Sequence, residues 1–361
     1  MAAVYRGRRV LVTGHTGFKG GWLAAWLHVL GAEVFGFALE PPPGPGVFCD
    51  AGLDALCHHT VGDVRDAAAV EAAIRGARPE AIFHLAAQPI VRLSYERPVE
   101  TVETNVMGTA NVLNAVRTTG TRAAVVVVTT DKVYADRDWD FGYRETDSLS
   151  GYDPYAGSKA ACEIIVASFR QSFFQPSQLQ AHGVALATAR AGNVIGGGDW
   201  AADRILPDAI RALTQERPIG VRNPDAVRPW QHVLEPLGGY LILGARLMAS
   251  AASDAAELCD AWNFGPWMDN AQPVRRMVDE VVKAWGTGSW VEQREANPPH
   301  ETKVLRLSTD KAQSRLGWTP KWDLPTTVAR TVEWYRAQAL GAGASQLRAL
   351  MTKQIEAYTA A

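Results

Sequence analysis

Short apolar runs alternate with longer segments of helical periodicity through the first half of the chain. The apolar runs are rich in valine, whereas the segments between them repeat apolar residues with the spacing of a helix. This alternation predicts βαβ units with right-handed crossovers and a parallel sheet covered by helices on both faces. The expected strands lie at 9–14, 33–39, 81–87, 123–130 and 183–196, and the expected helices at 20–31, 67–77, 105–120 and 158–174.

One of the expected strands ends in an unusual set of polar residues. The run VVVV at 125–128 is typical of a strand buried on both faces of a parallel sheet. It is followed almost at once by Thr130, Asp131 and Lys132, which bring a hydroxyl, an acid and a base together. Ligands of such sheets bind outside the carboxyl ends of the strands, so these three residues are candidates for chemistry.

The second half of the chain has a different character. Beyond about residue 193 the alternation fades, and glycine, proline and tryptophan become frequent. A chain of 361 residues is also longer than one compact core usually holds, so we expect a second, smaller lobe of loops and short elements. The stretch LGAGAS at 340–345 predicts a break before a last amphipathic helix.

Composition narrows the class of protein without indicating a function. With 36 basic and 38 acidic residues, the chain has no global charge that would attract nucleic acid or an anionic membrane. Four cysteines (Cys49, Cys57, Cys162 and Cys259) show no disulfide or metal-ligand spacing. No segment reaches the ~20 apolar residues of a membrane span, and the N-terminus lacks the apolar run of a signal peptide. We therefore expect a cytoplasmic protein with reduced thiols and no metal site.

The sequence VLVTGHTGFKGGWL places Gly14, Gly17 and Gly20 between the first strand and the first helix. Glycine lets a backbone turn tightly and approach a pyrophosphate, which the free N–H groups of the following helix stabilise. Glu40, 20 residues after Gly20, favours NAD because a carboxylate binds the ribose hydroxyls and repels a 2′-phosphate. His15 and Lys19 in the turn favour a phosphorylated ribose instead, and the residues alone leave this choice open.

Tyr155 and Lys159 form a second candidate motif, four residues apart at the start of an expected helix. Oxidation of an alcohol by hydride transfer needs a base for the hydroxyl proton. The ordinary pKa of tyrosine is about 10, so a nearby cation such as Lys159 has to lower it before the phenol acts near neutrality. Thr130 would hydrogen-bond the substrate hydroxyl.

With its Gly-x-x-Gly-x-x-Gly turn, strand-end threonine and Tyr-x-x-x-Lys pair, the chain resembles the extended short-chain dehydrogenase/reductase family over about residues 8 to 265. The resemblance implies an α/β fold with a Rossmann-type doubly wound parallel sheet and a smaller C-terminal α/β substrate lobe. We expect an NAD-binding domain at 1–192, with 230–265 returning to it, and a nucleotide-sugar domain formed by 193–229 and 266–361.

Asp131 and Lys132 narrow the resemblance to the 4,6-dehydratases of that family. Asp-Lys at this place, together with long stretches such as RAGNVIGGGDW and RPWQHVLEPLGGYL, is similar to the CDP-glucose 4,6-dehydratase subgroup. The resemblance implies oxidation of C4 of a nucleotide-linked hexose, removal of the C5 proton with loss of the C6 hydroxyl, and return of the hydride to C6. Lys132 is then the base for C5, or a cation that stabilises the enolate, and Asp131 is the acid for the leaving hydroxyl. The catalytic set is completed by Thr130, Tyr155 and Lys159.

The resemblance also implies which residues hold the cofactor and the substrate. For the substrate we expect Arg92, Ser94, Asn193, Arg204, Arg222, Arg228, His300 and Glu301, with Asn193 and Arg228 on the diphosphate and His300 and Glu301 near the nucleoside. For NAD we expect Gly14, Thr16, Gly17, Phe18, Lys19, Gly20, Glu40, Asp63, Val64, Leu85, Ala86, Ala87, Gln88, Asn105, Thr129, Tyr155 and Lys159.

The expected partner is the small molecule CDP-D-glucose, with no nucleic acid and no membrane, and a homodimer built through a four-helix bundle. Residue chemistry does not separate cytosine from other bases. A dehydratase or epimerase for dTDP-glucose, UDP-glucose or GDP-mannose therefore remains open, as does a non-catalytic nucleotide-binding sensor. The intact Thr130, Tyr155 and Lys159 count against the sensor.

Overall fold

Seven parallel strands form the central sheet of the computed structural model, which describes residues 1–249, 254, 257–293 and 305–361. The strand order is β11-β6-β5-β4-β1-β2-β3, so the chain reverses direction across the sheet at β1. The strands are β1 (Arg9–Thr13), β2 (Glu33–Ala38), β3 (His58–Val61), β4 (Ala81–His84), β5 (Ala124–Val128), β6 (Ala185–Ala191) and β11 (Ala261–Phe264). The predicted doubly wound α/β sheet is confirmed.

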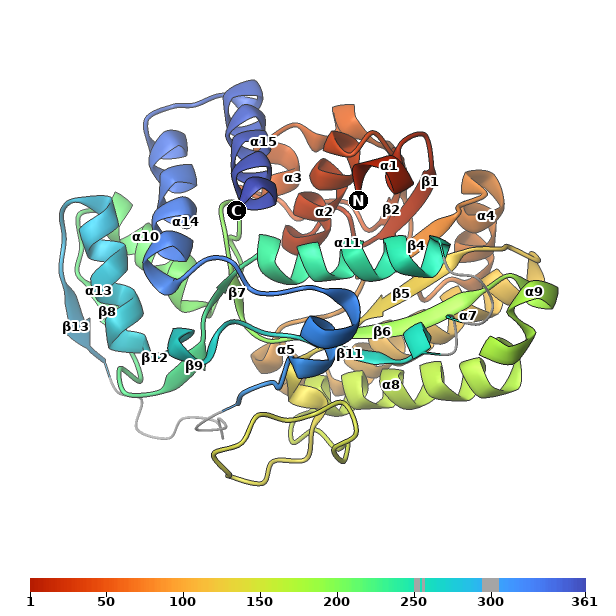
Figure 1. Ribbon diagram of the computed structural model, residues 1–361. Helices are drawn as coiled ribbons and strands as arrows, with labels where there is room; N and C mark the ends of the chain where they lie inside the picture. Colours follow the sequence, from red (N-terminus) through yellow and green to blue (C-terminus); the bar gives the residue numbers. More distant parts are fainter. Residues whose placement is uncertain (250–253, 255–256, 294–304) are drawn as a thin grey trace.

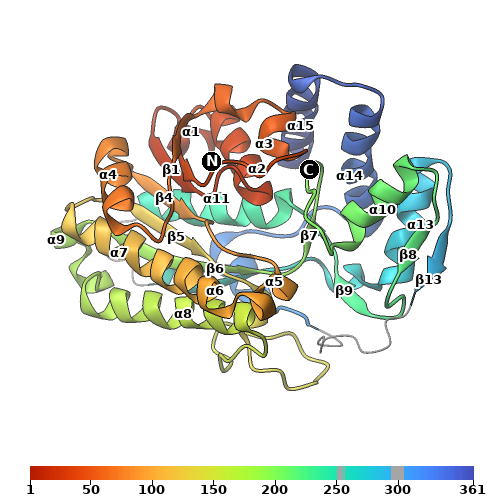
Figure 2. The ribbon, with the colours of Figure 1, turned by 180° about the vertical axis from the view of Figure 1, so that it is seen from behind.

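Helices cover both faces of this sheet (Figure 1). One face carries α2 (Phe18–Val29), α11 (Leu234–Ala249) and α15 (Ala344–Ala360), and the other carries α4 (Ala67–Ala77), α7 (Gly108–Thr118) and α8 (Pro154–Ser172). Figure 2 shows α7 and α8 beside each other on the second face.

The four valines of β5 divide between the two cores. Val126 and Val128 pack in the core under α2 and α11, whereas Val125 and Val127 pack in the core under α7 and α8. Burying a valine side chain stabilises a fold by roughly 1.5–3 kcal/mol. This alternation makes β5 a rigid support for whatever follows its carboxyl end.

A smaller lobe lies beyond the carboxyl ends of the strands, where β6 leads into β7 (Figure 1). Its helices are α10 (Ile205–Thr214), α13 (Val274–Trp285) and α14 (Leu324–Ala339). Three two-stranded pairs complete it, which are β7 (Val194–Ile195) with β10 (Gln231–His232), β9 (Val227–Pro229) with β12 (Ala271–Pro273), and β8 (Ile219–Val221) with β13 (Trp290–Glu292).

The apolar core under α2 and α11 continues into this lobe without a break, since Ile210, Val281 and Val328 belong to the same cluster as Val10. The segment 230–265 supplies the strand β11 to the sheet and the helix α11 to one of its faces. The last helix, α15, begins after the break at 340–343 and packs on α2 as well as on α14. The division into two domains stays a prediction.

The other α-helices of the described residues are short: α1 (Ala2–Tyr5), α3 (Val47–Asp50), α5 (Val91–Glu96), α6 (Pro98–Val102) and α9 (Leu179–His182). A π-helical turn, η2 (Glu103–Met107), joins α6 to α7. No helix among the described residues is long and apolar enough to cross a bilayer. The same part of the chain contains no group of three or more His, Cys, Asp or Glu side chains that could hold a metal ion.

Candidate functional site

The glycine-rich turn follows β1, at the point where the strand order reverses. Gly14 has a φ of +77°, and a Cβ atom on it would lie 2.7 Å from the backbone nitrogen of Ala86. A Cβ atom on Gly20 would lie 2.1 Å from the carbonyl oxygen of Gly14. Gly17 is the N-cap of the 12-residue helix α2 and has no side chain to cap it, so the first N–H groups of the helix are left without a capping side chain. The turn has the shape and the donors to cradle a pyrophosphate.

The loop after β4 is tied to the helix that carries Tyr155. The Asn105 side chain accepts a hydrogen bond from the Gln88 backbone at 2.8 Å and donates one to Ser158 Oγ at 2.8 Å. Behind it, His84 is buried between the hydroxyls of Thr13 and Thr109. Burial lowers the pKa of His84 to about 3, and the Lys159 charge acts in the same direction. The imidazole is therefore neutral.

The residues predicted to meet the adenosine lie at the ends of the next two strands. Glu40 is exposed and lies two residues after β2. The Thr16 hydroxyl donates a hydrogen bond to the carbonyl of Leu39, the residue before Glu40, at 3.1 Å. Asp63 follows β3 and pairs with Arg65 at 2.6 Å, which lowers the pKa of its carboxyl. Val64 is buried.

His15 and Lys19, the two residues that favour a phosphorylated ribose, bond other residues than those predicted to meet the adenosine. His15 is fully buried, and its Nε2 lies 2.6 Å from His59 Nδ1. Lys19 Nζ donates to Tyr240 Oη on α11 at 2.9 Å. Burial lowers the pKa of Lys19 to about 7, with Lys159 and Arg204 acting in the same direction. Lys19 thus lies close to the candidate catalytic groups.

Thr130, Asp131 and Lys132 form a tight turn where β5 ends. Thr130 is the N-cap of a short 3₁₀ turn, η3 (Asp131–Val133), and its hydroxyl donates to Asp131 Oδ1 at 3.0 Å. Thr130 and Asp131 are buried and Lys132 is half-buried. These residues therefore cap the end of the strand, and this role is compatible with a role in catalysis.

Tyr155 and Lys159 lie on α8 beside this turn. Asp153 caps the helix by accepting from the Ala156 backbone at 2.8 Å, and Pro154 follows at the first helical position. Lys159 Nζ donates to the carbonyl of Val128, the last residue of β5, at 3.0 Å. The structure therefore joins the strand tip and the Tyr-x-x-x-Lys motif, as predicted for one site.

The pKa of Tyr155 differs from the prediction. Burial raises it to about 12, the Thr130 hydrogen bond lowers it, and the Asp131 charge raises it. Burial also lowers the pKa of Lys159, whose ammonium group binds a backbone carbonyl rather than the phenol. Without a bound cofactor, the pKa of Tyr155 is thus raised, whereas the sequence predicted that it is lowered.

The predicted substrate residues that the structure describes lie on several elements, and acidic side chains hold three of the arginines. Arg204 pairs with Asp199 at 2.8 Å. Arg222 of the small lobe and Arg92 of α5 both approach Asp203, at 3.2 and 3.9 Å. Asp203 therefore connects the two lobes.

The other predicted substrate residues differ in their surroundings. Asn193 is half-buried just before β7, and Arg228 is buried on β9. Ser94 is fully buried and its hydroxyl donates to the Val91 carbonyl at 2.6 Å, so it is not presented to an open surface. His300 and Glu301 lie outside the described residues.

Four residues that the sequence did not single out lie directly behind the site. Glu163 and Arg190 form a buried ion pair of 2.9 Å, and both bond residues that flank the turn after β5. Tyr134 is one of these flanking residues, and Tyr240 holds Lys19. Only Glu163 had a visible signal, because it follows Lys159 by four residues on α8 and so faces the same side.

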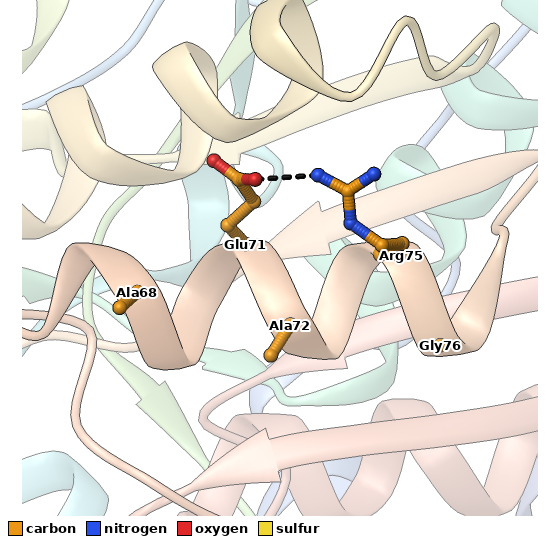
Figure 3. A pocket seen from close by; sticks show the side chains of 5 residues that line it. All are labelled: Ala68, Glu71, Ala72, Arg75 and Gly76. Carbon is orange, nitrogen blue, oxygen red and sulfur yellow. Dashed lines mark hydrogen bonds and ion pairs between the residues drawn. The ribbon is translucent and has the colours of Figure 1, made fainter.

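A shallow hollow on the surface of α4 is unrelated to these residues. Figure 3 shows it lined by one helix only, with Glu71 and Arg75 joined by an ion pair of 2.5 Å. None of the predicted site residues that the structure describes contributes to it. The candidate site therefore lies at the carboxyl ends of the strands of the central sheet and not at this hollow.

Comparisons with known proteins show the family of this chain. The family described as GDP-mannose 4,6 dehydratase matches residues 11–331. A CDP-glucose 4,6-dehydratase of Salmonella typhimurium is 47% identical over 338 residues, which cover 93% of each chain.

Solved structures share the fold. The UDP-glucose 4-epimerase of Thermus thermophilus, solved in complex with NAD, has a TM-score of 0.75 at 25% identity and covers 91% of this chain and 99% of its own. A dTDP-glucose 4,6-dehydratase of Streptomyces venezuelae has a TM-score of 0.74 at 24% identity, covers 91% of this chain and 97% of its own, and supports the fold alone. Because the family model matches residues 11–331 and one relative is 47% identical, this chain belongs to the GDP-mannose 4,6 dehydratase family.

Proposed function

We propose that this protein is an NAD-dependent hydro-lyase that converts CDP-D-glucose to CDP-4-dehydro-6-deoxy-D-glucose and water. The observation that carries the proposal is the 47% identity with a CDP-glucose 4,6-dehydratase over 93% of both chains. The gathering of Thr130, Asp131, Tyr155 and Lys159 at the carboxyl end of β5 supports it, because these groups suit both hydride transfer and elimination.

The residues around the glycine-rich turn fit NAD. The cradle formed by Gly14 and Gly20 leaves no room for a side chain, and the uncapped start of α2 offers N–H donors to a pyrophosphate. Glu40 at the end of β2 suits a ribose with free hydroxyls. Bound there, NAD would accept the hydride from C4 and return it to C6.

In the first half of the proposed reaction, Tyr155 would take the proton of the C4 hydroxyl once the positive charges of Lys159 and bound oxidised NAD lower the pKa that burial has raised. The interaction of the phenol with Thr130 lowers the pKa of Tyr155 against the effect of burial, which raises it. Lys159 fixes the tip of β5 through Val128 and places a cation next to the same site. Thr130 and Tyr155 thereby hold the substrate hydroxyl between them.

In the second half, Asp131 and Lys132 act on C5 and C6. Oxidation at C4 acidifies the C5 proton, which Lys132 removes while Asp131 protonates the leaving C6 hydroxyl. Both residues belong to one short turn that Thr130 caps, so their positions relative to the C4 site are fixed by the same backbone. Arg204, Arg222, Arg228 and Asn193 supply charge and amide groups for the diphosphate.

A homodimer belongs to the same proposal. The surface formed by α6, η2 and α8 exposes large apolar side chains, namely Val99, Val102, Met107 and Ile164. Exposed apolar groups gathered on neighbouring helical elements are typical of an interface. A second copy that packs the same helices across a two-fold axis would complete a four-helix bundle.

The function is tested by incubating the purified protein with NAD and, separately, CDP-glucose, dTDP-glucose, UDP-glucose and GDP-mannose. We expect the keto sugar from CDP-glucose, detected by its absorbance in alkali, without net accumulation of reduced cofactor. Equal turnover of several bases would contradict the specificity, an epimer without a keto sugar would indicate an epimerase, and binding without turnover would indicate a sensor.

A further inference from the structure

A buried ion pair holds both ends of the turn that carries the proposed catalytic residues. Glu163 Oε1 accepts from Thr129 Oγ1 at 2.5 Å, immediately before the turn, and Arg190 Nη1 donates to Tyr134 Oη at 2.8 Å, immediately after it. Glu163 and Arg190 themselves are joined at 2.9 Å. We call these four residues the clasp, and the segment between its ends contains Thr130–Val133.

The clasp is anchored to two strands, β6 and β11, and to the helix that carries Lys159. Thr188 on β6 donates to the second oxygen of Glu163 at 2.7 Å, and Asn263 on β11 accepts from Tyr134 Oη at 2.7 Å. Asn263 Nδ2 in turn donates to the Tyr143 carbonyl at 2.9 Å. All four clasp residues have 5% or less of their surface exposed, so solvent does not screen these interactions.

Fold stability alone does not account for such an arrangement. Taking two charges out of water costs several kcal/mol per ion, and well-packed apolar residues often replace a buried pair without loss. Arg190 Nε is also buried without a hydrogen-bond partner among the described residues. Burying this ion pair costs free energy, and one of its N–H groups has no hydrogen-bond partner in the described part of the chain. Because the pair nevertheless bonds both ends of one four-residue turn, it suits a positioning role.

From this geometry, and resting on the proposed function, we infer that Glu163 and Arg190 are positioning residues. Acting through Thr129 and Tyr134, they hold Asp131 and Lys132 in register with Thr130 and Tyr155, so that elimination at C5 and C6 follows oxidation at C4 on one bound sugar. Neither residue of the ion pair touches the reacting atoms. Tyr134 is the end of the clasp nearer to Lys132, and Thr129 is the end nearer to Thr130.

The sharpest variant is Tyr134→Phe, which removes one buried hydroxyl and keeps the ring. Its matched control is Tyr5→Phe, because Tyr5 is also fully buried and donates a single hydrogen bond, to the Leu241 carbonyl at 2.8 Å, away from the turn. In single turnover of NAD-loaded protein with CDP-glucose, Tyr134→Phe should slow solvent exchange at C5 about tenfold or more. Transfer of the C4 hydride should change less than threefold, and Tyr5→Phe should alter neither step.

Amide hydrogen exchange without substrate provides a second readout. Tyr134→Phe should raise exchange at residues 130–133 about tenfold and leave the rest of the sheet unchanged, whereas Tyr5→Phe should not affect these amides. Glu163→Gln tests the other end, with Glu235→Gln as the control, since Glu235 is a buried carboxylate bonded to Tyr358 and the Trp322 backbone. Equal slowing of both chemical steps, or unchanged exchange at 130–133, would overturn the inference. If the wild type forms no keto sugar, the proposed function fails, and the exchange data still decide whether the clasp orders the turn.

Discussion

At the scale of single residues, Lys132 is the group on which the proposed elimination depends most directly. Lys132→Met keeps the length of the side chain and removes the amine. Because general base catalysis contributes on the order of 10²–10⁴-fold, we expect keto-sugar formation to fall by about that factor. Reduced nicotinamide should instead accumulate on the enzyme, since Tyr155 and Thr130 still support oxidation at C4.

Solvent deuterium entering C5 measures this step directly. Lys353→Met, on an exposed lysine whose side chain is 69% accessible, is the control and should behave as the wild type. If Lys132→Met exchanges the C5 proton at the normal rate, Lys132 is not the base.

His84 governs a different property, the response of stability to acid. Its pKa in the folded protein is about 3, against about 6.5 in an unfolded chain, so between these values only the unfolded state binds the proton. The stabilisation is therefore complete above pH 6.5 and is lost as the pH falls toward 3. Over the interval from pH 6.5 to 5 this amounts to about 2 kcal/mol.

Denaturant unfolding at pH 7.5 and pH 5 tests this dependence. The loss of unfolding free energy between the two values should be smaller in His84→Gln than in the wild type, whatever the absolute stability of the variant. His28→Gln, on the exposed end of α2, should leave the difference unchanged. An equal loss in His84→Gln and wild type would show that His84 does not carry this dependence.

At the scale of elements, the surface formed by α6, η2 and α8 predicts association. Ile164 on α8 has 60% of its surface exposed and belongs to the expected interface. Ile164→Glu would place a charge in a desolvated contact, so we expect the dimer dissociation constant to rise at least about tenfold.

Analytical ultracentrifugation at micromolar concentration measures this shift. Leu340→Glu introduces the same charge at a residue that is 85% exposed, after the end of α14, and should leave the dimer intact. A wild-type protein that sediments as a monomer would contradict the dimer itself.

At the scale of the whole molecule, the proposed reaction returns the hydride to the same sugar that supplied it. The turn after β1, the tip of β5 and the start of α8 lie at the carboxyl ends of the strands, so the groups proposed to act at C4, C5 and C6 belong to one region. CDP-glucose labelled with deuterium at C4 should therefore give a product with the label at C6 in the same molecule.

Mass spectrometry of a mixture of labelled and unlabelled substrate distinguishes the possibilities. Transfer of the label between molecules, or its loss to solvent, would mean that the cofactor or the intermediate leaves before the second half of the reaction. Unlabelled CDP-glucose alone, carried through the same procedure, gives the baseline for natural isotope content.

Much of the molecule was predictable because its signals are local. The alternation of apolar runs and helical stretches predicted the parallel sheet, and the VVVV run predicted a strand buried on both sides. The glycine spacing predicted the turn, whose close approach to Ala86 leaves room for no side chain at Gly14. Each of these features depends on neighbours in the sequence, so periodicity and residue type were sufficient.

Other features depended on distances between residues far apart in the sequence, and only the tertiary structure decided them. The contact of Lys19 with Tyr240, 221 residues away, placed that lysine near Lys159 and Asp131. The direction of the Tyr155 pKa followed from burial that no local pattern reveals. The bonds from Glu163 and Arg190 to Thr129 and Tyr134 join α8, β6 and the end of β5. The sequence by itself thus determined which groups the strand ends carry, whereas folding decided how those groups are paired, because charge and hydrogen bonding act through space and not along the chain.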